Sequence, residues 1–128
     1  MRPIKFRLWN RPLNKMQKVS FLQFWGRGVG LLTSTGDHYQ LDPKQGELMQ
    51  FTGVKDENGR EIYEGDIVQT YEIDDDGRPI NAVVKYEDHL AGFTLTNEYQ
   101  GVWRRLDNDY PVIGNIYENP ELLEARHD

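Results

Sequence analysis

The sequence predicts a mostly β protein, with a β arm at the N-terminal end, a small barrel after it and a short helix at the C-terminal end. Short runs in which hydrophobic and polar residues alternate recur along the 128 residues, and turn-forming Gly, Asn, Asp and Pro separate them. The aromatic residues (three Trp, seven Tyr and five Phe) supply enough apolar surface for a folded core.

The N-terminal β arm is expected within residues 1–50. Alternation predicts strands at Ile4–Trp9 and Met16–Phe24, which the turn residues Asn10–Lys15 join into a hairpin. The glycine-rich segment Gly26–Gly30 is interpreted as a break followed by a mobile loop, because it lacks the other residues of a phosphate-binding motif. Shorter strands are expected near residues 39–41 and 47–52.

The barrel is expected within residues 51–128 and is expected to form one compact unit with the arm. Strands are predicted up to Ile73 and then at 80–86, 93–96, 101–106 and 110–117, a spacing that favours a small barrel. We find no internal repeat in the sequence. Asn119 followed by Pro120 predicts a two-turn helix ending near Arg126, because Asn favours the N-cap and Pro the first helical position.

Several classes of function are disfavoured. The absence of Cys excludes disulfides, thiolate zinc sites and cysteine nucleophiles. The three histidines do not have metal-ligand spacing. The acidic run Glu72–Gly77 lacks the acid that a calcium loop needs at its twelfth position, where Val83 stands. We therefore expect no enzyme, catalytic residue, metal or cofactor. No run is apolar and long enough for a signal peptide or a membrane span, so a cytoplasmic protein without a membrane partner is expected.

The charge is divided unevenly along the chain. The net charge is −6, but residues 1–36 contain seven basic and no acidic residues. The remainder contains eight basic and twenty-one acidic residues, a charge of −13. Aromatic residues lie among the basic ones near the N-terminus. The candidate binding residues of this region are Lys5, Arg7, Trp9, Arg11, Lys15, Lys18, Trp25 and Arg27.

Three interpretations of this basic region are open. The favoured one makes it the interface of a homo-oligomer or of a complex with another protein. It can instead bind single-stranded nucleic acid, since cations contact phosphates and aromatic rings stack on bases, although the charge of the remaining chain repels phosphate. The basic side chains can also simply pair with acidic residues of their own chain.

The segment Phe51–Val68 closely resembles the signature of the YopX family, which comprises proteins of phages and prophages of bacteria. The opening Ile4–Trp9 and the closing Val112–Leu123 fit the same family in the same order, so the resemblance spans nearly the whole chain. It implies a phage- or prophage-encoded protein whose C-terminal part is an SH3-like barrel. It implies no biochemical activity, because the family's members have no established one.

The signature is interpreted as a fold-forming bend. Asn58-Gly59 suits a tight turn with positive φ, and Gly65 suits a sharp bend after which Asp66 accepts backbone N–H bonds. The fold-signature residues are Gly53, Asn58, Gly59, Tyr63, Gly65 and Asp66, and the expected buried residues are Ile62, Tyr63, Ile67 and Val68. The less favoured interpretation is an acidic catalytic or metal cluster of Asp56, Glu57, Glu61, Glu64 and Asp66.

The sequence departs from the family at one place. The family's opening strand commonly has an acidic residue after the Trp, whereas Asn10, Arg11 and Pro12 follow Trp9 here. The basic region is therefore interpreted as a property of this member. The sequence as a whole predicts a non-catalytic interaction module or homo-oligomer, and the alternative is a nucleic-acid-binding protein that uses the basic, aromatic N-terminal region.

Overall fold

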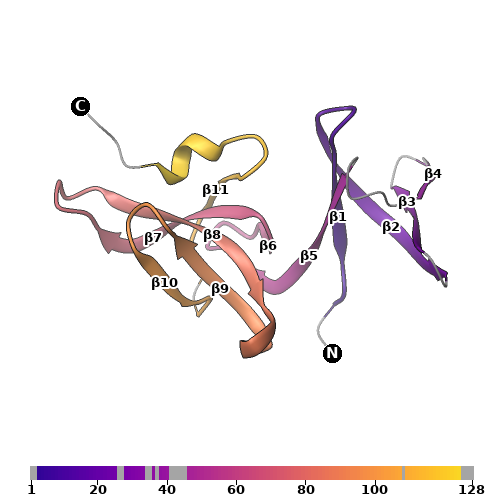
Figure 1. Cartoon of the computed structure of the whole chain (residues 1–128). Helices are drawn as coiled ribbons and strands as arrows, with labels where there is room; N and C mark the ends of the chain where they lie inside the picture. Colours follow the sequence, from indigo (N-terminus) through magenta and orange to yellow (C-terminus); the bar gives the residue numbers. More distant parts are fainter. Residues whose placement is uncertain are drawn as a thin grey trace. The chain divides into compact units, whose positions relative to one another are not determined.

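The computed structural model describes residues 3–25, 28–33, 36, 38–40, 46–107 and 109–124. These residues form two antiparallel sheets and two 3₁₀ helices (Figure 1), so the predicted mostly β class is confirmed. The strands are β1 (Phe6–Asn10), β2 (Lys15–Trp25), β3 (Gly28–Thr33), β4 (His38–Gln40), β5 (Gly46–Lys55), β6 (Glu61–Tyr63), β7 (Asp66–Ile73), β8 (Pro79–Glu87), β9 (Gly92–Asn97), β10 (Val102–Arg105) and β11 (Val112–Asn115). The 3₁₀ helices are η1 (Asp88–Leu90) and η2 (Pro120–Leu123).

Internal contacts divide the chain into two compact units, Met1–Phe51 and Thr52–Asp128. This border lies one residue beyond the border that the sequence predicts between arm and barrel. Strand β5 crosses it, and the end of β5 pairs with β6 in the second unit. The strand order across the whole first sheet is β4-β3-β2-β1-β5-β6.

In the first unit, β1 lies between β2 and β5. Phe6 stands opposite Val19 of β2 and Gln50 of β5. The predicted hairpin of β1 and β2 is closed by a turn in which Asn14 adopts a φ of 52°. Leu8 and Trp9 are both buried, although successive residues of a strand point to opposite faces. Side chains on both faces of β1 are therefore buried at these two positions.

The prediction of a mobile loop at Gly26–Gly30 is wrong for Gly28–Gly30, whereas β2 does end at Trp25, directly before the predicted break. Gly28 begins strand β3 and stands opposite Trp25, and Gly30 stands opposite Gln23. Glycine is depleted in strands, which is why the segment reads as a loop. Pairing with the long strand β2 overrides this preference. Gly26 and Arg27 lie outside the described residues.

The second unit contains a five-stranded sheet of order β10-β9-β8-β7-β11. Its buried core cluster consists of Ile62, Val68, Ala82, Val84, Leu95 and Tyr110. The four residues that the signature predicts to be buried are indeed buried, each with at most 8% of its surface exposed. The sheet has two edge strands, β10 and β11, so hydrogen bonding does not close it into a barrel. The SH3-like form of this unit stays a prediction.

A single 3₁₀ turn, η2, stands where the sequence predicts a two-turn helix. Asn119 is at its N-cap and Pro120 follows, as expected. The Asn119 side chain does not cap the turn, because its Oδ1 accepts the backbone N–H of Asn115 (3.3 Å) instead. The predicted helix end at Arg126 lies outside the described residues.

Candidate functional site

Three basic side chains of the first unit share one face of its sheet. Arg7 of β1 stands directly opposite Lys18 of β2 and, on its other side, opposite Met49 of β5. The Lys5 Nζ lies over the ring of Phe51, two residues beyond Met49 on the same side of β5, at 5.6 Å from the ring centroid. We call Lys5, Arg7 and Lys18 the basic face. Residues directly opposite in a sheet have Cβ atoms about 5 Å apart, so the register brings these charges close together.

The other predicted binding residues are not part of this face. Arg11 lies in the β1–β2 turn and its Nη2 pairs with Glu47 Oε1 at 2.9 Å, so this cation is engaged by an acid of its own unit. Lys15 is exposed and stands opposite Asn10, on the other face. Trp25 ends β2, far along the strand from Lys18, and Arg27 lies outside the described residues.

Trp9 shares the side of β1 on which Arg7 lies, but it is buried, with 5% of its surface exposed. A nucleic-acid base needs an accessible ring face for stacking. Trp9 therefore does not offer the aromatic platform that the nucleic-acid interpretation assigns to it.

The signature turn is organised by Asp56, which is buried. Its Oδ1 accepts the N–H groups of Asn58 (2.9 Å) and Arg60 (2.8 Å), and its Oδ2 accepts the N–H of Val112 (3.0 Å). Burial alone would raise the pKa of this carboxyl, but the three N–H groups and the Arg60 guanidinium outweigh burial and hold the pKa below its ordinary value. Asp56 is thus a structural anion that ties the turn to β11.

The glycines and Asp66 of the signature have the predicted conformational roles. Gly53, Gly59 and Gly65 have φ values of 89°, 84° and 83°, in the region that residues with a Cβ rarely adopt. Asp66 is buried and its Oδ2 accepts the N–H of Tyr63 at 2.8 Å. Glu57 is exposed and stands apart from these bonds. Asp56 and Asp66 therefore serve the backbone, as the fold-forming interpretation expects of Asp66.

The second unit contains two copies of one hairpin, which corrects the prediction of no internal repeat. Residues 52–62 and 70–80 share Thr, Asp, Gly, Arg and Ile at equivalent positions. In the first copy the Thr52 hydroxyl donates to Ile62 O (2.8 Å) and accepts the Val54 N–H (3.1 Å). In the second, Thr70 bonds Ile80 O (2.7 Å) and the Glu72 N–H (3.2 Å) in the same way.

The two turns are equivalent as well. Asp74 Oδ1 accepts the N–H groups of Asp76 and Arg78, both at 2.9 Å, as Asp56 Oδ1 accepts those of Asn58 and Arg60. The run Glu72–Gly77, considered above as a calcium loop, is thus a hairpin turn between β7 and β8. Each copy is a single hairpin of eleven residues, shorter than the units of the common repeat proteins, so the repeat is easily overlooked in the sequence.

A groove of about 230 Å³ opens beside the second turn. Polar side chains from the β7–β8 hairpin, the β9–β10 turn and the η2 region line it, namely Asp74, Arg78, Asn81, Gln100, Glu121 and Glu124, together with the apolar Pro79 and Leu122. Asn81 Nδ2 donates to Leu122 O (2.8 Å) and Asn97 Nδ2 to Leu123 O (3.0 Å), so η2 is fixed to the sheet. We call this feature the hairpin groove. Sequence reasoning missed it, because its walls come from three separate segments.

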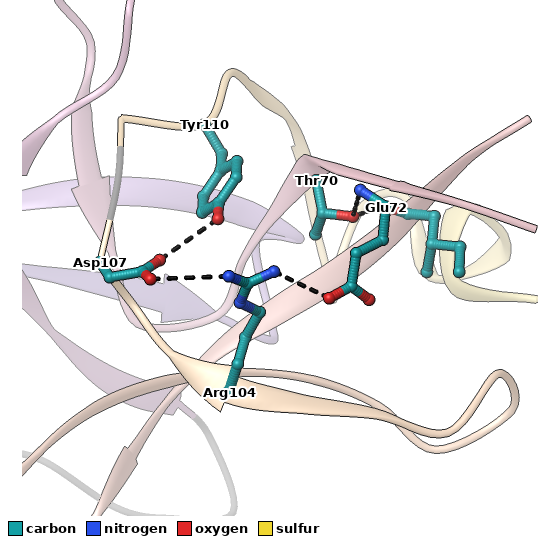
Figure 2. Close-up of polar contacts among 6 residues, drawn as sticks. Thr70, Glu72, Arg104, Asp107 and Tyr110 are labelled. Carbon is teal, nitrogen blue, oxygen red and sulfur yellow. Dashed lines mark hydrogen bonds and ion pairs between the residues drawn. The ribbon is translucent and has the colours of Figure 1, made fainter.

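Arg104 of β10 connects distant parts of the second unit (Figure 2). Its guanidinium bonds Glu72 of β7 at 2.8 Å and lies 3.6 Å from Asp107, whose carboxylate accepts the Tyr110 hydroxyl at 3.2 Å. Burial raises the pKa of Tyr110, and the nearby Asp107 raises it further. The sequence carries no signal for this network, since its members come together only in the folded sheet.

The described residues include no group of three or more His, Cys, Asp or Glu side chains that could hold a metal ion. His89, the histidine whose side chain is described, is exposed and lies 3.9 Å from Glu87. Across the same part of the chain, no helix has both the length and the apolar character needed to cross a membrane.

Comparison with known proteins gives one family and one solved structure of interest. The family model described as YopX protein matches residues 5–124. The crystal structure of protein EF1440 from Enterococcus faecalis is 28% identical in sequence, covers 97% of this chain and 100% of its own, and superposes with a TM-score of 0.63. No match was found among curated proteins.

Proposed function

The chain belongs to the YopX family, and we propose that it is a non-catalytic interaction module that self-associates. In this proposal the basic face of one copy contacts the acidic second unit of another copy. Two further parts of the proposal rest on the family resemblance: the chain is encoded by a phage or prophage, and its second unit has an SH3-like form. Action in the bacterial cytoplasm is a third part, which rests on the lack of a run apolar and long enough for a signal peptide or a membrane span.

The division of charge between the two units carries this proposal. Residues 1–51 contain eight basic and three acidic residues, a charge of +5, whereas residues 52–128 contain seven basic and eighteen acidic residues, a charge of −11. The two units of the fold thus carry net charges of opposite sign. Oppositely charged surfaces attract over about a Debye length and orient an encounter. A second copy always supplies the complementary surface.

The register of β1 and β2 supports the position of this interface. Like charges directly opposite each other in a sheet are destabilising, and Arg7 stands opposite Lys18. Lys18 is exposed. A carboxylate from a neighbouring copy that reached the exposed Lys18 would offset part of the repulsion on that cation.

The roles of the buried acids support the non-catalytic part of the proposal. Asp56 and Asp66 are the buried carboxylates of the described chain, and both accept backbone N–H bonds. A general acid or base needs a carboxyl that can exchange its proton with a substrate, and one with a pKa near the working pH acts best. The pKa of Asp56 is shifted in the opposite direction, below its ordinary value.

Light scattering at micromolar concentration tests the proposal. At low salt we expect an average mass above the 15.0 kDa of one chain, and a decrease toward that mass as salt is added. Lys18→Glu is expected to weaken association. The control Lys85→Glu makes the same change of charge on the acidic unit and should leave association intact. A monomer at low salt would refute self-association, and equal effects of the two variants would show that net charge alone matters.

Nucleic-acid binding by the basic face is the competing function. The cations Lys5, Arg7 and Lys18 could contact phosphates, but the ring of Trp9 is buried and is not available for stacking on a base. A fluorescence titration with labelled single-stranded DNA and RNA at two salt concentrations examines it. Under our proposal neither binds appreciably at low salt, whereas tight and salt-dependent binding would favour the nucleic-acid function instead.

A further inference from the structure

The first hairpin shows how this type of turn holds an extended segment of chain. Asp56 Oδ2 accepts the N–H of Val112 at 3.0 Å, and the backbone N–H of Glu57 donates to Asp109 O at 2.9 Å. The Arg60 guanidinium donates to Val112 O at 3.4 Å. Three groups of one turn thus bind the main chain of residues 109–112.

The second hairpin presents the equivalent carboxylate to the hairpin groove. Asp74 Oδ1 is used within the turn, but its Oδ2 makes no hydrogen bond with any other described residue. The backbone N–H of Asp75, equivalent to that of Glu57, is also unbonded within the described chain. Asp74 and Arg78 line the groove at the positions where Asp56 and Arg60 hold residues 109–112. Within the described chain, the second hairpin therefore leaves two groups open, Asp74 Oδ2 and the Asp75 N–H, whose equivalents in the first hairpin hold residues 109–112.

We propose that the hairpin groove binds an extended peptide, the N-terminal segment around Pro3–Lys5 of a second copy, with Asp74 Oδ2 accepting the backbone N–H of Ile4. This proposal rests on the proposed self-association, because a second copy supplies the segment. It adds to that function a defined site on the acidic unit.

Two properties of the N-terminal segment match the groove. The groove has three acidic side chains, Asp74, Glu121 and Glu124, against one basic side chain, whereas the segment contains Arg2 and Lys5 and no acid. In addition, the N–H that Asp56 binds belongs to Val112, a β-branched residue directly after Pro111. Ile4 is likewise β-branched and directly follows Pro3, and 72% of its surface is exposed.

Fluorescence anisotropy with a labelled peptide of residues 1–6 tests the site on the full-length chain. Asp74→Asn keeps a carbonyl oxygen for the turn but replaces Oδ2, the oxygen not used within the turn, by an NH₂ group, which cannot accept an N–H. We expect the peptide to bind the natural chain and to bind this variant at least about tenfold more weakly, since hydrogen bonds to charged groups are the stronger ones. The matched control is Asp76→Asn, which removes the same charge from an exposed turn residue outside the groove, where the first hairpin carries Asn58, and should leave binding unchanged.

The peptide itself provides the sharper test. N-methylation at Ile4 removes the N–H that Asp74 accepts and keeps every side chain, so we expect this peptide to bind as weakly as a scrambled peptide of the same composition. Equal binding of all three peptides would overturn the proposal, because charge alone would then explain it. A chain ending at residue 124 should bind the peptide at least as well as the whole chain. Loss of binding in that chain would assign the site to the C-terminal residues and overturn the proposal too.

The experiment separates failure of this site from failure of self-association. If the natural chain associates in light scattering but Asp74→Asn associates equally well and no peptide binds, the groove proposal is wrong and the proposed function stands. If the natural chain is a monomer but the peptide binds and N-methylation abolishes binding, the groove is a peptide site and the proposed self-association is wrong.

Discussion

Asp56 and Asp74 occupy equivalent positions in two copies of one hairpin, and among the described residues only Asp56 holds a further strand, β11. Each carboxylate accepts two backbone N–H groups within its turn at 2.8–2.9 Å, and Asp56 accepts a third from Val112 at 3.0 Å. The first turn is therefore tied to β11 through the buried Asp56, and the second turn faces the hairpin groove. Different consequences of mutation follow for two residues with the same local sequence.

Replacement of the two aspartates should therefore have unequal effects on stability. Asp56→Ala removes three hydrogen bonds to a buried carboxylate and leaves the Val112 N–H without its partner, so we expect the free energy of unfolding to fall by about 2–4 kcal/mol. Asp74→Ala, in a half-buried turn, should cost about 1 kcal/mol. Urea unfolding followed by tryptophan fluorescence measures both. Equal losses would show that the bond to Val112 contributes nothing to stability.

The lowered pKa of Asp56 makes stability depend on acid pH. Because the folded-state pKa lies below the unfolded value near 3.8, the ionised carboxylate stabilises the fold above about pH 4, and this contribution is lost as the pH falls through the folded-state pKa. Urea midpoints between about pH 7 and pH 3 should therefore fall more steeply for the natural chain than for Asp56→Asn. Asp75→Asn, which alters an exposed acid, should keep the steep fall. Identical pH profiles for all three proteins would contradict the role assigned to Asp56.

The two hairpin threonines should be equally important for stability. Thr52 and Thr70 are buried, and each hydroxyl donates to the carbonyl of the equivalent isoleucine, Ile62 or Ile80, and accepts a backbone N–H. Thr→Val at either position keeps the shape and removes both bonds, so we expect a loss of about 1–3 kcal/mol in each. Thr96 provides the control, because its Oγ1 is buried without a hydrogen-bond partner, and Thr96→Val should be neutral or stabilising. Thermal or urea unfolding of the three variants measures these changes in the free energy of unfolding. A clear loss of stability in Thr96→Val would show that the Thr96 hydroxyl makes a stabilising hydrogen bond.

The network of Figure 2 predicts unequal roles for two neighbouring arginines. Arg104 bridges Glu72 and Asp107, whereas Arg105 is exposed and forms no ion pair with the described residues. We expect Arg104→Ala to lower the urea midpoint at low salt and Arg105→Ala to leave it unchanged. Added salt should reduce the difference between the urea midpoints of the two variants, since exposed ion pairs are screened. A difference that persists at high salt would mean that the Arg104 side chain stabilises the unit by packing.

The sequence predicts most strands of this fold because their apolar residues alternate and their turns carry characteristic residues. Ile62 and Val68 are examples, since both are buried as their pattern indicates. The exception is β3, where glycine preferences point to a loop and tertiary pairing with β2 prevails. The 3₁₀ turn at Pro120 is a second exception, because the Asn119 side chain bonds Asn115 and not the start of a helix.

The candidate sites depend on relationships that a single sequence does not contain. The basic residues are visible in the sequence, but the pairing of Arg7 with Lys18 requires the register of two strands, and burial of Trp9 requires the packed fold. The two copies of the hairpin have the same residue at five of their eleven equivalent positions. The different surroundings of Asp56 and Asp74 can be recognised only in the folded structure.

Cross-linking of mixed isotopes tests most directly whether the basic face of one copy meets the acidic unit of another. Equal amounts of labelled and unlabelled chain would be mixed at low salt and treated with a carbodiimide, which joins lysine amines to carboxylates in contact. The account predicts peptides of mixed isotope that link Lys5 or Lys18 to carboxylates of residues 52–128, and their loss at high salt. Links found only within single-isotope chains, or mixed links that avoid the basic face, would contradict it.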